Sequence, residues 1–324
     1  MSKPLIWIID EEWPDYDVEK ALLEKAFPGC DLRFSGNDYG ADLDAFGSEA
    51  EGILCQVYVD MPRETIERLD RCRILSVFGG GYDRVDYRAA RERGIEVTFV
   101  PGYCVEDVSD HVIASIYHAN KKITAYGPAL EAGLWGAPAV KDPVRRIAGS
   151  TLFVVGLGRI GGTVARKAKA LGMDVLAFDP YVEPSRFESL GVLPVAWEEG
   201  FRQADFLSVN AKLTAETEGM IDGAALALMK PTAYVINTAR GAIVDEEALV
   251  DAVNGGRLAG ASLDVVRREP PCLSDPVFHC PPILVTPHIS YLSEQSFGEL
   301  RRRATENVID VLQGRPVRDR VDSK

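Results

Sequence analysis

The chain has 324 residues, of which 46% are hydrophobic and 26% are charged, and this length predicts two domains that each bury a core. A formal net charge of −13 repels nucleic-acid phosphates, so nucleic acid is not an expected partner. No apolar run is long enough to span a membrane, and six scattered cysteines without metal-ligand spacing indicate reduced thiols, no metal site and a cytoplasmic protein.

Short apolar runs alternate with helical patterns from the amino terminus to about residue 101. The runs are "PLIWIID", "DLRFSG", "GILCQVYV", "RILSVFGG" and "IEVTFVP". Helical spacing lies between them, as in "VEKALLEKAF" and "DYRAARERG". Apolar strands separated by helices predict a parallel sheet that is covered by helices on both faces.

A long helical pattern begins at Val105 and reaches about Tyr126, and a Gly/Pro/Ala-rich arm that contains Trp135 follows it. Six further strand-like runs then alternate with helices and form a second, larger unit. These runs are "TLFVVG", "DVLAFD", "DFLSVN", "AYVINT", "GASLDV" and "ILVTP". We therefore predict an α/β protein with two doubly wound parallel sheets.

The last helical pattern, from about residue 293 to 314, follows the final strand and is free to return to the first domain. It contains the one basic run of the chain, Arg301 to Arg303. The periodicity of "ELRRRATENVIDVL" predicts that this run is the solvated face of a helix.

A glycine motif marks a candidate cofactor site in the second unit. Gly156, Gly158 and Gly161 form G-x-G-x-x-G directly after a strand and at the start of a helix. The first glycine permits a tight turn, the second lets the backbone approach a pyrophosphate, and the third lets helix and strand pack closely. Asp179 ends the next strand, where a carboxylate accepts hydrogen bonds from ribose and repels a 2′-phosphate. This context predicts NAD rather than NADP, and the alternative is a structural turn with an incidental aspartate.

Three candidate catalytic residues follow three successive strands of the same unit. Arg240 lies in "VINTARG", Glu269 in "SLDVVRREPP" and His288 in "VTPHIS". Because ligands bind at the carboxyl ends of strands in doubly wound sheets, the three side chains can meet in one crevice. A guanidinium grips a carboxylate with two donors, and a Glu–His pair orients the imidazole and favours its protonated form. Each residue taken alone also fits a structural role: a surface arginine, a helix-capping glutamate or a hydrogen-bonded histidine.

With these residues identified, the sequence resembles the NAD-dependent D-2-hydroxyacid dehydrogenase family over nearly its whole length. The segments that carry the resemblance are "VVGLGRIGG", "FDP", "LTAETEGMI", "VINTARGAIVDEEAL", "GASLDV" followed by "EP", and "VTPHIS". The family implies that residues 1–101 and 289–324 form a flavodoxin-like substrate-binding domain, into which a Rossmann NAD-binding domain of residues 102–288 is inserted. It also implies a homodimer through the NAD domain, to which the long helix and the arm around Trp135 contribute.

The resemblance implies roles for individual residues of the cofactor site and the catalytic site. Arg240, Glu269 and His288 match the catalytic trio, with His288 as general acid/base. Asp264 matches the residue that binds the nicotinamide amide. Besides Asp264, the three glycines and Asp179, the residues implied for cofactor binding are Val108, Arg159, Ile160, Asn210, Thr238 and Ala239.

Other residues are expected to contact the substrate. "FGGGYDRVD" resembles the family's substrate-carboxylate loop, so Gly80 and Gly81 are expected backbone donors. Gln56, Tyr58 and Tyr291 are expected to shape the pocket for the substrate side chain. For Tyr291, simple packing at the start of a helix is an equal alternative.

Two departures from the family pattern bear on the substrate. The chain has "NAKLT" where the family often has "HCPLT", and Lys212 fits either a contact with cofactor or substrate or a solvated loop. At the position of Gln56, the pattern that phosphoglycerate dehydrogenases resemble has an arginine that binds the phosphate of the substrate. This difference argues against a phosphorylated substrate.

We therefore expect hydride transfer from NADH to C2 of a 2-oxo acid, with a proton from His288, to give a D-2-hydroxy acid. The segments "VPGYCVEDVSDH" and "PHISYLSEQSFGELR" resemble the family branch that contains the C-terminal binding proteins. The alternative function is accordingly an NAD(H)-sensing, corepressor-like protein with weak dehydrogenase activity. Formate dehydrogenases share the fold but resemble a pattern with glutamine at the position of Glu269.

Overall fold

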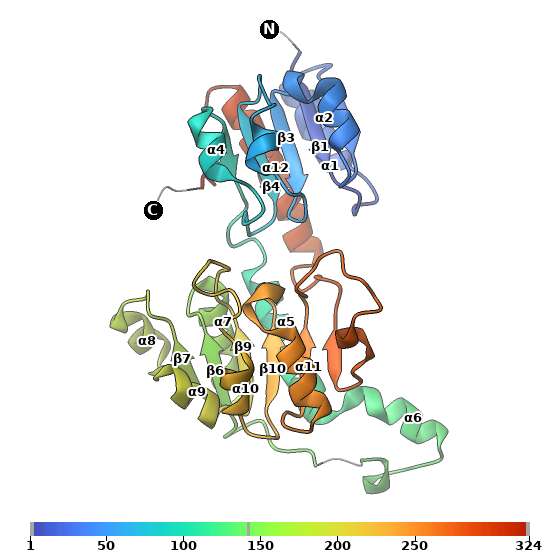
Figure 1. Cartoon of the computed structure of the whole chain (residues 1–324), viewed down its shortest axis with the longest axis vertical. Coiled ribbons are helices and arrows are strands. Elements are labelled where there is room, and N and C mark those ends of the chain that lie inside the picture. Colours follow the sequence, from blue (N-terminus) through green and yellow to red (C-terminus); the bar gives the residue numbers. More distant parts are fainter. Residues whose placement is uncertain (1–2, 141–142, 322–324) are drawn as a thin grey trace. The chain divides into compact units, whose positions relative to one another are not determined.

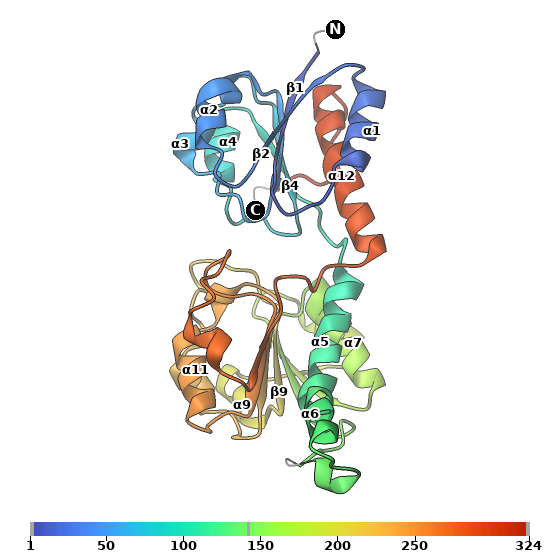
Figure 2. The same ribbon diagram turned by 90° about the vertical axis from the view of Figure 1, so that its right-hand side faces the viewer.

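The computed structural model describes residues 3–140 and 143–321 and contains two compact units (Figures 1 and 2). The first unit comprises Met1–Cys104 and Leu292–Lys324, and the second comprises Val105–Tyr291. The C-terminal helix α12 (Glu294–Leu312) therefore belongs to the first unit, as its position after the last strand allowed. Residues 141 and 142 of the expected arm lie outside the described residues.

The first unit is built around a five-stranded parallel sheet in the order β2-β1-β3-β4-β5. Its strands are β1 (Leu5–Ile9), β2 (Asp31–Ser35), β3 (Gly52–Gln56), β4 (Ile74–Phe78) and β5 (Glu96–Thr98). Its helices are α1 (Asp17–Ala26), α2 (Gly40–Phe46), η1 (Gly47–Glu49), α3 (Arg63–Ile66), α4 (Tyr87–Glu92) and α12. Figure 2 shows α1 and α12 on one face of the sheet and α2, α3 and α4 on the other. Because both faces are covered, every residue of β1, β3 and β4 is buried.

The solvated face predicted for the basic run of α12 is wrong for Arg301 and Arg303. Only 5% of the Arg301 side chain is exposed, and its Nη2 lies 2.6 Å from Oε2 of Glu19, which is fully buried. The Arg303 guanidinium donates to the Asp319 carboxylate at 2.7 Å. Helix α12 packs against β4 on one side and against α1 on another. The face that carries Arg301 is therefore buried in the contact with α1, although its charge suggested a solvent-exposed face. Of the three arginines, Arg302 is the exposed one.

We expect the change Glu19→Gln to destabilise the first unit. Arg301 donates to both carboxylate oxygens of Glu19, from Nε at 2.8 Å and from Nη2 at 2.6 Å, so the variant leaves a buried guanidinium with incomplete charge compensation. Breaking a buried ion pair from one side lowers the free energy of unfolding by roughly 3 kcal/mol. Urea unfolding of the full chain measures the change. The matched control Arg302→Ala removes an exposed pair with Glu306 and is expected to cost less than about 1 kcal/mol; equal losses in both variants would contradict the prediction.

The second unit is built around a seven-stranded parallel sheet in the order β12-β11-β10-β9-β6-β7-β8. Its strands are β6 (Thr151–Val155), β7 (Asp174–Phe178), β8 (Leu193–Pro194), β9 (Phe206–Val209), β10 (Tyr234–Asn237), β11 (Gly260–Leu263) and β12 (Ile283–Val285). Six of these strands confirm the six strands predicted from the sequence of this unit. The two-residue strand β8 was not predicted. The strand order reverses between β6 and β9, so their carboxyl ends flank the point where doubly wound sheets bind ligands.

Helices cover both faces of the second sheet. The helices of this unit are α5 (Val105–Lys121), η2 (Ile123–Ala125), α6 (Tyr126–Glu131), η3 (Ala137–Ala139), α7 (Arg159–Ala170), α8 (Pro184–Leu190), α9 (Trp197–Gln203), α10 (Gly223–Ala227), η4 (Gly241–Ile243), α11 (Glu246–Asn254) and η5 (Pro276–His279). Of these, η2, α6 and η3 belong to the arm that follows α5, and Figure 1 shows α6 extending away from the sheet. Figure 2 shows α5 and α7 on one face and α9 and α11 on the other. Helix α5 ends earlier than the predicted Tyr126, because Lys122 adopts a left-handed backbone with φ of 55°.

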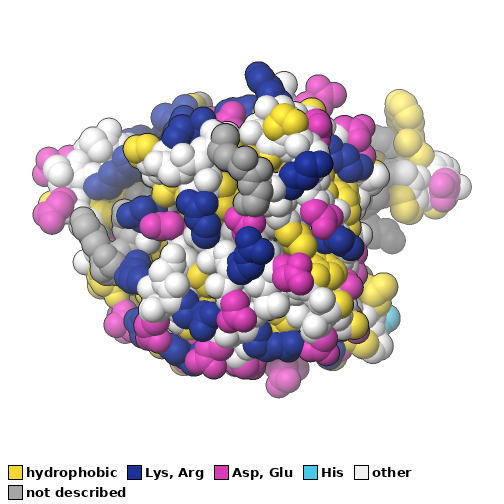
Figure 3. Space-filling model, turned by 90° about the horizontal axis from the view of Figure 1, so that it is seen from above, with side chains coloured by type: hydrophobic (Ala, Val, Ile, Leu, Met, Phe, Trp, Pro, Cys, Tyr) yellow, Lys and Arg dark blue, Asp and Glu magenta, His cyan; other side chains and the backbone are white. Residues whose placement is uncertain are grey.

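The surface carries charged side chains of both signs. On the face shown in Figure 3, Lys and Arg side chains are interspersed with Asp and Glu side chains, and no continuous basic surface is visible there. Among the described residues, no helix is long and apolar enough to cross a membrane, and no group of three or more His, Cys, Asp or Glu side chains could hold a metal ion.

Candidate functional site

The three motif glycines occupy the positions that a dinucleotide loop requires. Gly156 has φ of 89°, and a Cβ there would lie 2.8 Å from the backbone N of Ala211. A Cβ on Gly161 would lie 2.0 Å from the carbonyl O of Gly156, so the helix packs directly on the loop. Around Gly158, in contrast, a Cβ would meet no atom within 4 Å. The space in front of Gly158, at the N-terminus of the 12-residue α7, fits a pyrophosphate.

Asp179 follows β7 directly and is fixed against the glycine loop. Its Oδ2 accepts a hydrogen bond from the Leu157 N–H at 2.7 Å, and its Oδ1 accepts one from the Tyr181 N–H at 3.0 Å. The carboxylate is half-buried. A negative charge is thus held beside the loop, where an adenosine ribose would bind.

Two buried polar atoms that follow the next strands lack partners among the described residues. They are Oδ1 of Asn210, which follows β9, and Oγ1 of Thr238, which follows β10. The Asn210 amide donates instead to the Ser208 carbonyl at 3.1 Å. Because buried polar atoms in proteins are almost always hydrogen-bonded, these two indicate a polar ligand at the carboxyl ends of β9 and β10, beside the switch point of the sheet. A nicotinamide ribose has hydroxyl groups that fit such acceptors.

The remaining predicted cofactor residues lie around this loop or at the adjacent strand end. Arg159 and Ile160 are the first two residues of α7, with Arg159 exposed and Ile160 half-buried. Val108 is buried on α5. Ala239 donates its N–H to Oδ1 of Asn237 at 3.0 Å, which shapes the turn after β10.

The structure brings His288 and Glu269 into direct contact. The Nδ1 atom of His288 lies 3.0 Å from Oε2 of Glu269, and only 18% and 14% of the two side chains are exposed. The other carboxylate oxygen of Glu269 accepts the N–H of Val266 at 3.2 Å, which fixes the carboxylate. An ionised carboxylate at Nδ1 selects the tautomer with a proton on Nδ1, so Nε2 is the ring atom that can exchange a proton with a substrate.

Arg240 lies on the neighbouring strand end, in a turn that packs on the glutamate loop. A Cβ on the next residue, Gly241, would lie 2.0 Å from the carbonyl carbon of Val266, so this close approach requires glycine. Arg240 donates from Nη1 to the carbonyl of Ala239 at 2.8 Å. The strands β10, β11 and β12 are adjacent and parallel. Arg240, Glu269 and His288 therefore all follow carboxyl ends at one edge of the sheet.

His288 itself has a left-handed backbone with φ of 51°. Its N–H donates to the main-chain oxygen of Asp264 at 2.8 Å. The Asp264 side chain, 1% exposed, accepts hydrogen bonds from the same turn. Asp264 was expected to bind the nicotinamide amide, and the structure adds contacts that the sequence did not predict.

The predicted substrate residues of the first unit share one edge of its own sheet. Gln56 ends β3 and Gly80 and Gly81 follow β4, the strand that pairs with β3. Gln56 is 4% exposed, and its Oε1 accepts the Val57 N–H at 3.0 Å. Tyr58 is half-buried two residues beyond Gln56. Tyr291 is the last residue of the second unit.

Three residues that shape this site were missed from the sequence: Asn237, Thr286 and Gly241. Asn237 and Thr286 could have been found from the sequence, because each is a polar residue at the end of an apolar strand-like run, "VIN" and "LVT". Gly241 becomes informative only once the backbone of Val266 is known to lie against it.

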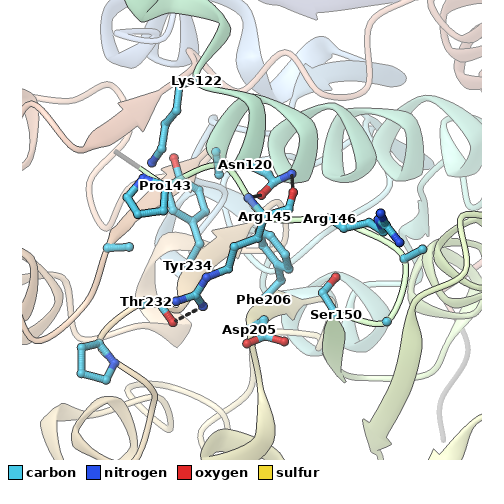
Figure 4. Close-up of a pocket in the computed structure, with 15 residues that line it drawn as sticks. Asn120, Lys122, Pro143, Arg145, Arg146, Ser150, Asp205, Phe206, Thr232 and Tyr234 are labelled. Carbon is cyan, nitrogen blue, oxygen red and sulfur yellow. Dashed lines mark hydrogen bonds between the residues drawn. The ribbon is translucent and has the colours of Figure 1, made fainter. Parts of the chain in front are cut away.

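A pocket of about 490 Å³ lies elsewhere in the second unit, at the opposite edge of the sheet (Figure 4). Its lining includes Ser150 and Asp205, which precede β6 and β9, and Arg145, which donates to the Thr232 hydroxyl at 3.0 Å. None of the predicted site residues lines this pocket. The candidate site is therefore located by the strand ends, and this pocket is separate from it.

Comparison with known proteins decides the family. Residues 113–290 match the NAD-binding domain of the D-isomer specific 2-hydroxyacid dehydrogenases. The chain belongs to the D-2-hydroxyacid dehydrogenase family. This family membership and the two-sheet α/β fold confirm the resemblance found in the sequence, and residues 113–290 form an NAD-binding domain.

Individual relatives match this chain over nearly its whole length. The chain is 35% identical over 322 residues, 99% of its length, to the D-3-phosphoglycerate dehydrogenase of Mycobacterium bovis, and it spans 59% of the length of that protein. A Thermus thermophilus protein of known structure is 31% identical, with a TM-score of 0.86 over 98% of this chain and 100% of the other. The D-lactate dehydrogenase of Aquifex aeolicus, solved with NAD and lactic acid, is 26% identical, with a TM-score of 0.86 over 96% of each chain. None of these relatives places the chain in the branch of the C-terminal binding proteins. Membership of that branch therefore stays a prediction.

Proposed function

We propose that the chain is an NAD-dependent reductase that converts a 2-oxo acid into a D-2-hydroxy acid. The observation that carries the proposal is the His288–Glu269 pair, with 3.0 Å between Nδ1 and Oε2, at the sheet edge where Arg240 also lies. An imidazole held by a carboxylate is a proton donor for a carbonyl, and a guanidinium is a receptor for the neighbouring carboxylate. Family membership and the names of the relatives support the same chemistry.

The chain's own side chains divide the reaction between them. NADH, when bound, supplies the hydride for C2 of the 2-oxo acid. Arg240 binds the substrate carboxylate and draws electron density toward the carbonyl oxygen. His288 delivers the proton to that oxygen through Nε2 as the C–O double bond becomes an alcohol. Glu269 stabilises the protonated imidazole before this transfer and keeps the ring oriented throughout.

Asp179 is proposed to select NAD over NADP. A 2′-phosphate would approach the Asp179 carboxylate, and like charges placed together cost several kcal/mol. We expect the change Asp179→Asn to raise the ratio of NADPH to NADH activity by at least about tenfold. Asparagine keeps one acceptor oxygen for the Leu157 N–H of the glycine loop and gives up the bond from the Tyr181 N–H, which lies outside that loop. Steady-state kinetics with both cofactors measures the ratio, and an unchanged ratio would show that another residue selects the cofactor.

The substrate is proposed to be an unphosphorylated 2-oxo acid. The neutral Gln56 at the end of β3 supports this, because a phosphate-binding site is usually built with arginine. The 35% identity to D-3-phosphoglycerate dehydrogenases points to the phosphorylated alternative, although the chain spans only 59% of that protein's length. A panel of NADH oxidation assays tests the two. It contains glyoxylate, pyruvate, hydroxypyruvate, 3-phosphohydroxypyruvate and branched, aromatic and dicarboxylic 2-oxo acids.

The panel also tests the proposed function as a whole. Turnover of one class of 2-oxo acid with NADH supports the reductase, and preference for 3-phosphohydroxypyruvate would overturn the unphosphorylated substrate alone. Tight NADH binding without turnover of any 2-oxo acid would contradict the reductase and favour an NAD(H)-sensing binding protein.

We also propose a cytoplasmic homodimer that assembles through the second unit. The cytoplasmic location is supported by all six cysteines being free thiols. The dimer is supported by apolar side chains exposed on the arm after α5, above all Trp135, which is 83% exposed, and Ile123, which is 59% exposed. Trp135→Ala is expected to shift the protein toward monomer in sedimentation velocity, whereas Leu193→Ser, a change at the exposed β8, leaves the dimer intact. A monomeric native protein would contradict this proposal.

A further inference from the structure

The turn that carries His288 is held by one buried carboxylate. Asp264, at the end of β11, accepts the N–H of Ile289 on Oδ1 and the N–H of Ser290 on Oδ2, both at 2.9 Å. The hydroxyl of Thr286 donates to Oδ1 at 2.6 Å. The main-chain oxygen of the same aspartate accepts the His288 N–H at 2.8 Å. Residues on both sides of the histidine, and the histidine itself, are therefore tied to Asp264.

This arrangement explains how His288 keeps an unfavourable backbone conformation. A residue with a Cβ rarely adopts positive φ, and it persists there only where surrounding contacts impose it. At His288 those contacts come from Asp264, which is 1% exposed and so bonds without competition from water. The direction in which the imidazole leaves the backbone therefore depends on the Asp264 side chain.

The adjacent strand end holds the arginine turn in a similar way. Asn237, also 1% exposed, donates from Nδ2 to the carbonyl of Arg240 at 3.0 Å and accepts the Ala239 N–H at 3.0 Å. The N–H of Asp264 donates to the carbonyl of Asn237 at 2.9 Å. Two buried polar side chains on neighbouring strands thus fix the arginine turn and the histidine turn against each other.

We propose that Asp264 is a positioning residue that holds His288 in place for proton transfer. The proposal deepens the proposed function and rests on it. A carboxylate offers about four acceptor sites, and three are occupied by the histidine turn. The remaining site can still accept a hydrogen bond from the nicotinamide amide, so positioning the histidine turn adds to that expected role.

The variant Asp264→Asn tests this role with little change in shape. The asparagine keeps one acceptor oxygen and turns an NH₂ group toward a backbone N–H of the turn, which loosens the histidine. Because small misplacement of a catalytic group can cost about 10²-fold, we expect kcat to fall by roughly 10²-fold. The KM for NADH should stay near the native value. The solvent deuterium isotope effect on kcat should increase, because proton transfer becomes the slow step.

Two further variants separate positioning from general damage. Thr286→Val removes one of the three donors to Asp264 and is expected to cause a smaller loss of kcat in the same direction, so the test survives if Asp264→Asn does not fold. Asn237→Ser, the matched control, loosens the arginine turn instead. It should raise the KM for the 2-oxo acid without increasing the solvent isotope effect.

Two readouts do not depend on turnover. Amide hydrogen exchange at Ile289 and Ser290 should accelerate in Asp264→Asn, and unchanged exchange would overturn the proposal. The second readout uses reduced 3-acetylpyridine adenine dinucleotide, an NADH analogue that lacks the amide NH₂. The ratio of its Kd to the Kd of NADH should be the same in the native protein and in Asp264→Asn.

Other outcomes would assign a different role. If Asp264→Asn had native kcat and a native isotope effect and lost only NADH affinity, Asp264 would be assigned to the nicotinamide amide. An inactive native protein would refute the proposed function, whereas an active native protein with a fully active variant refutes only the positioning role.

Discussion

In the His288→Ala variant, kcat for reduction of the best 2-oxo acid is expected to fall by about 10²–10⁴-fold, the usual contribution of general acid–base catalysis. The proposed function makes the imidazole of His288 the proton source, and the contact with Glu269, 3.0 Å from Nδ1 to Oε2, supports that role. NADH should bind as it does to the native protein, because the glycine loop and Asp179 are unchanged. Steady-state kinetics and NADH fluorescence titration measure the two quantities separately.

The matched control for this variant is His279→Ala. His279 is an exposed histidine at the end of η5 in the same unit. Its replacement is expected to leave kcat unchanged. A His288→Ala protein with native turnover would show that the proton comes from another group, and a parallel loss of NADH affinity would show that the variant damages the domain.

Replacing Arg240 with lysine is expected to lower kcat/KM for the 2-oxo acid by about 10²–10³-fold, as loss of a donor to developing negative charge does in other enzymes. Lysine keeps the charge but offers a point-like ammonium, whereas guanidinium presents two parallel N–H groups to a carboxylate. The turn leaves little freedom to compensate, because Gly241 lies against the backbone of Val266 and Asn237 holds the Arg240 carbonyl.

The control for Arg240→Lys is Arg268→Lys, because Arg268 is exposed on the loop just before Glu269. That change is expected to have no effect on kcat/KM. If Arg240→Lys retained native kcat/KM while His288→Ala was inactive, the carboxylate of the substrate would have to bind elsewhere. The chirality of the product would then be set by other contacts.

The sheets were predictable from the sequence because buried parallel strands are short and apolar throughout. The runs "LIWII" and "TLFVV" are almost wholly buried as β1 and β6. The glycine motif predicted the local geometry of Gly156 and Gly161, which close contacts require to be glycine, and the open space at Gly158 agrees with the expected approach of a phosphate. Arg240, Glu269 and His288 could be brought to one edge because each follows a strand, and neighbouring parallel strands end at the same edge.

Features that depend on packing between distant segments were not predictable. Periodicity separates the faces of α12 but does not say that α1 lies on the face that contains Arg301. The role of Asp264 depends on the left-handed backbone of His288, which no residue pattern in "TPHIS" indicates. The contacts of Thr286, Ile289 and Ser290 with that carboxylate exist only after β11 and β12 have paired.

The most direct test of the central claim is product analysis after complete oxidation of a known amount of NADH with the best 2-oxo acid of the panel. Chiral chromatography of the product measures both its amount and its configuration. The proposed function predicts one D-2-hydroxy acid per NADH consumed, with no product in the His288→Ala protein on the same timescale. An L or racemic product, or NADH that binds without being oxidised, would contradict it.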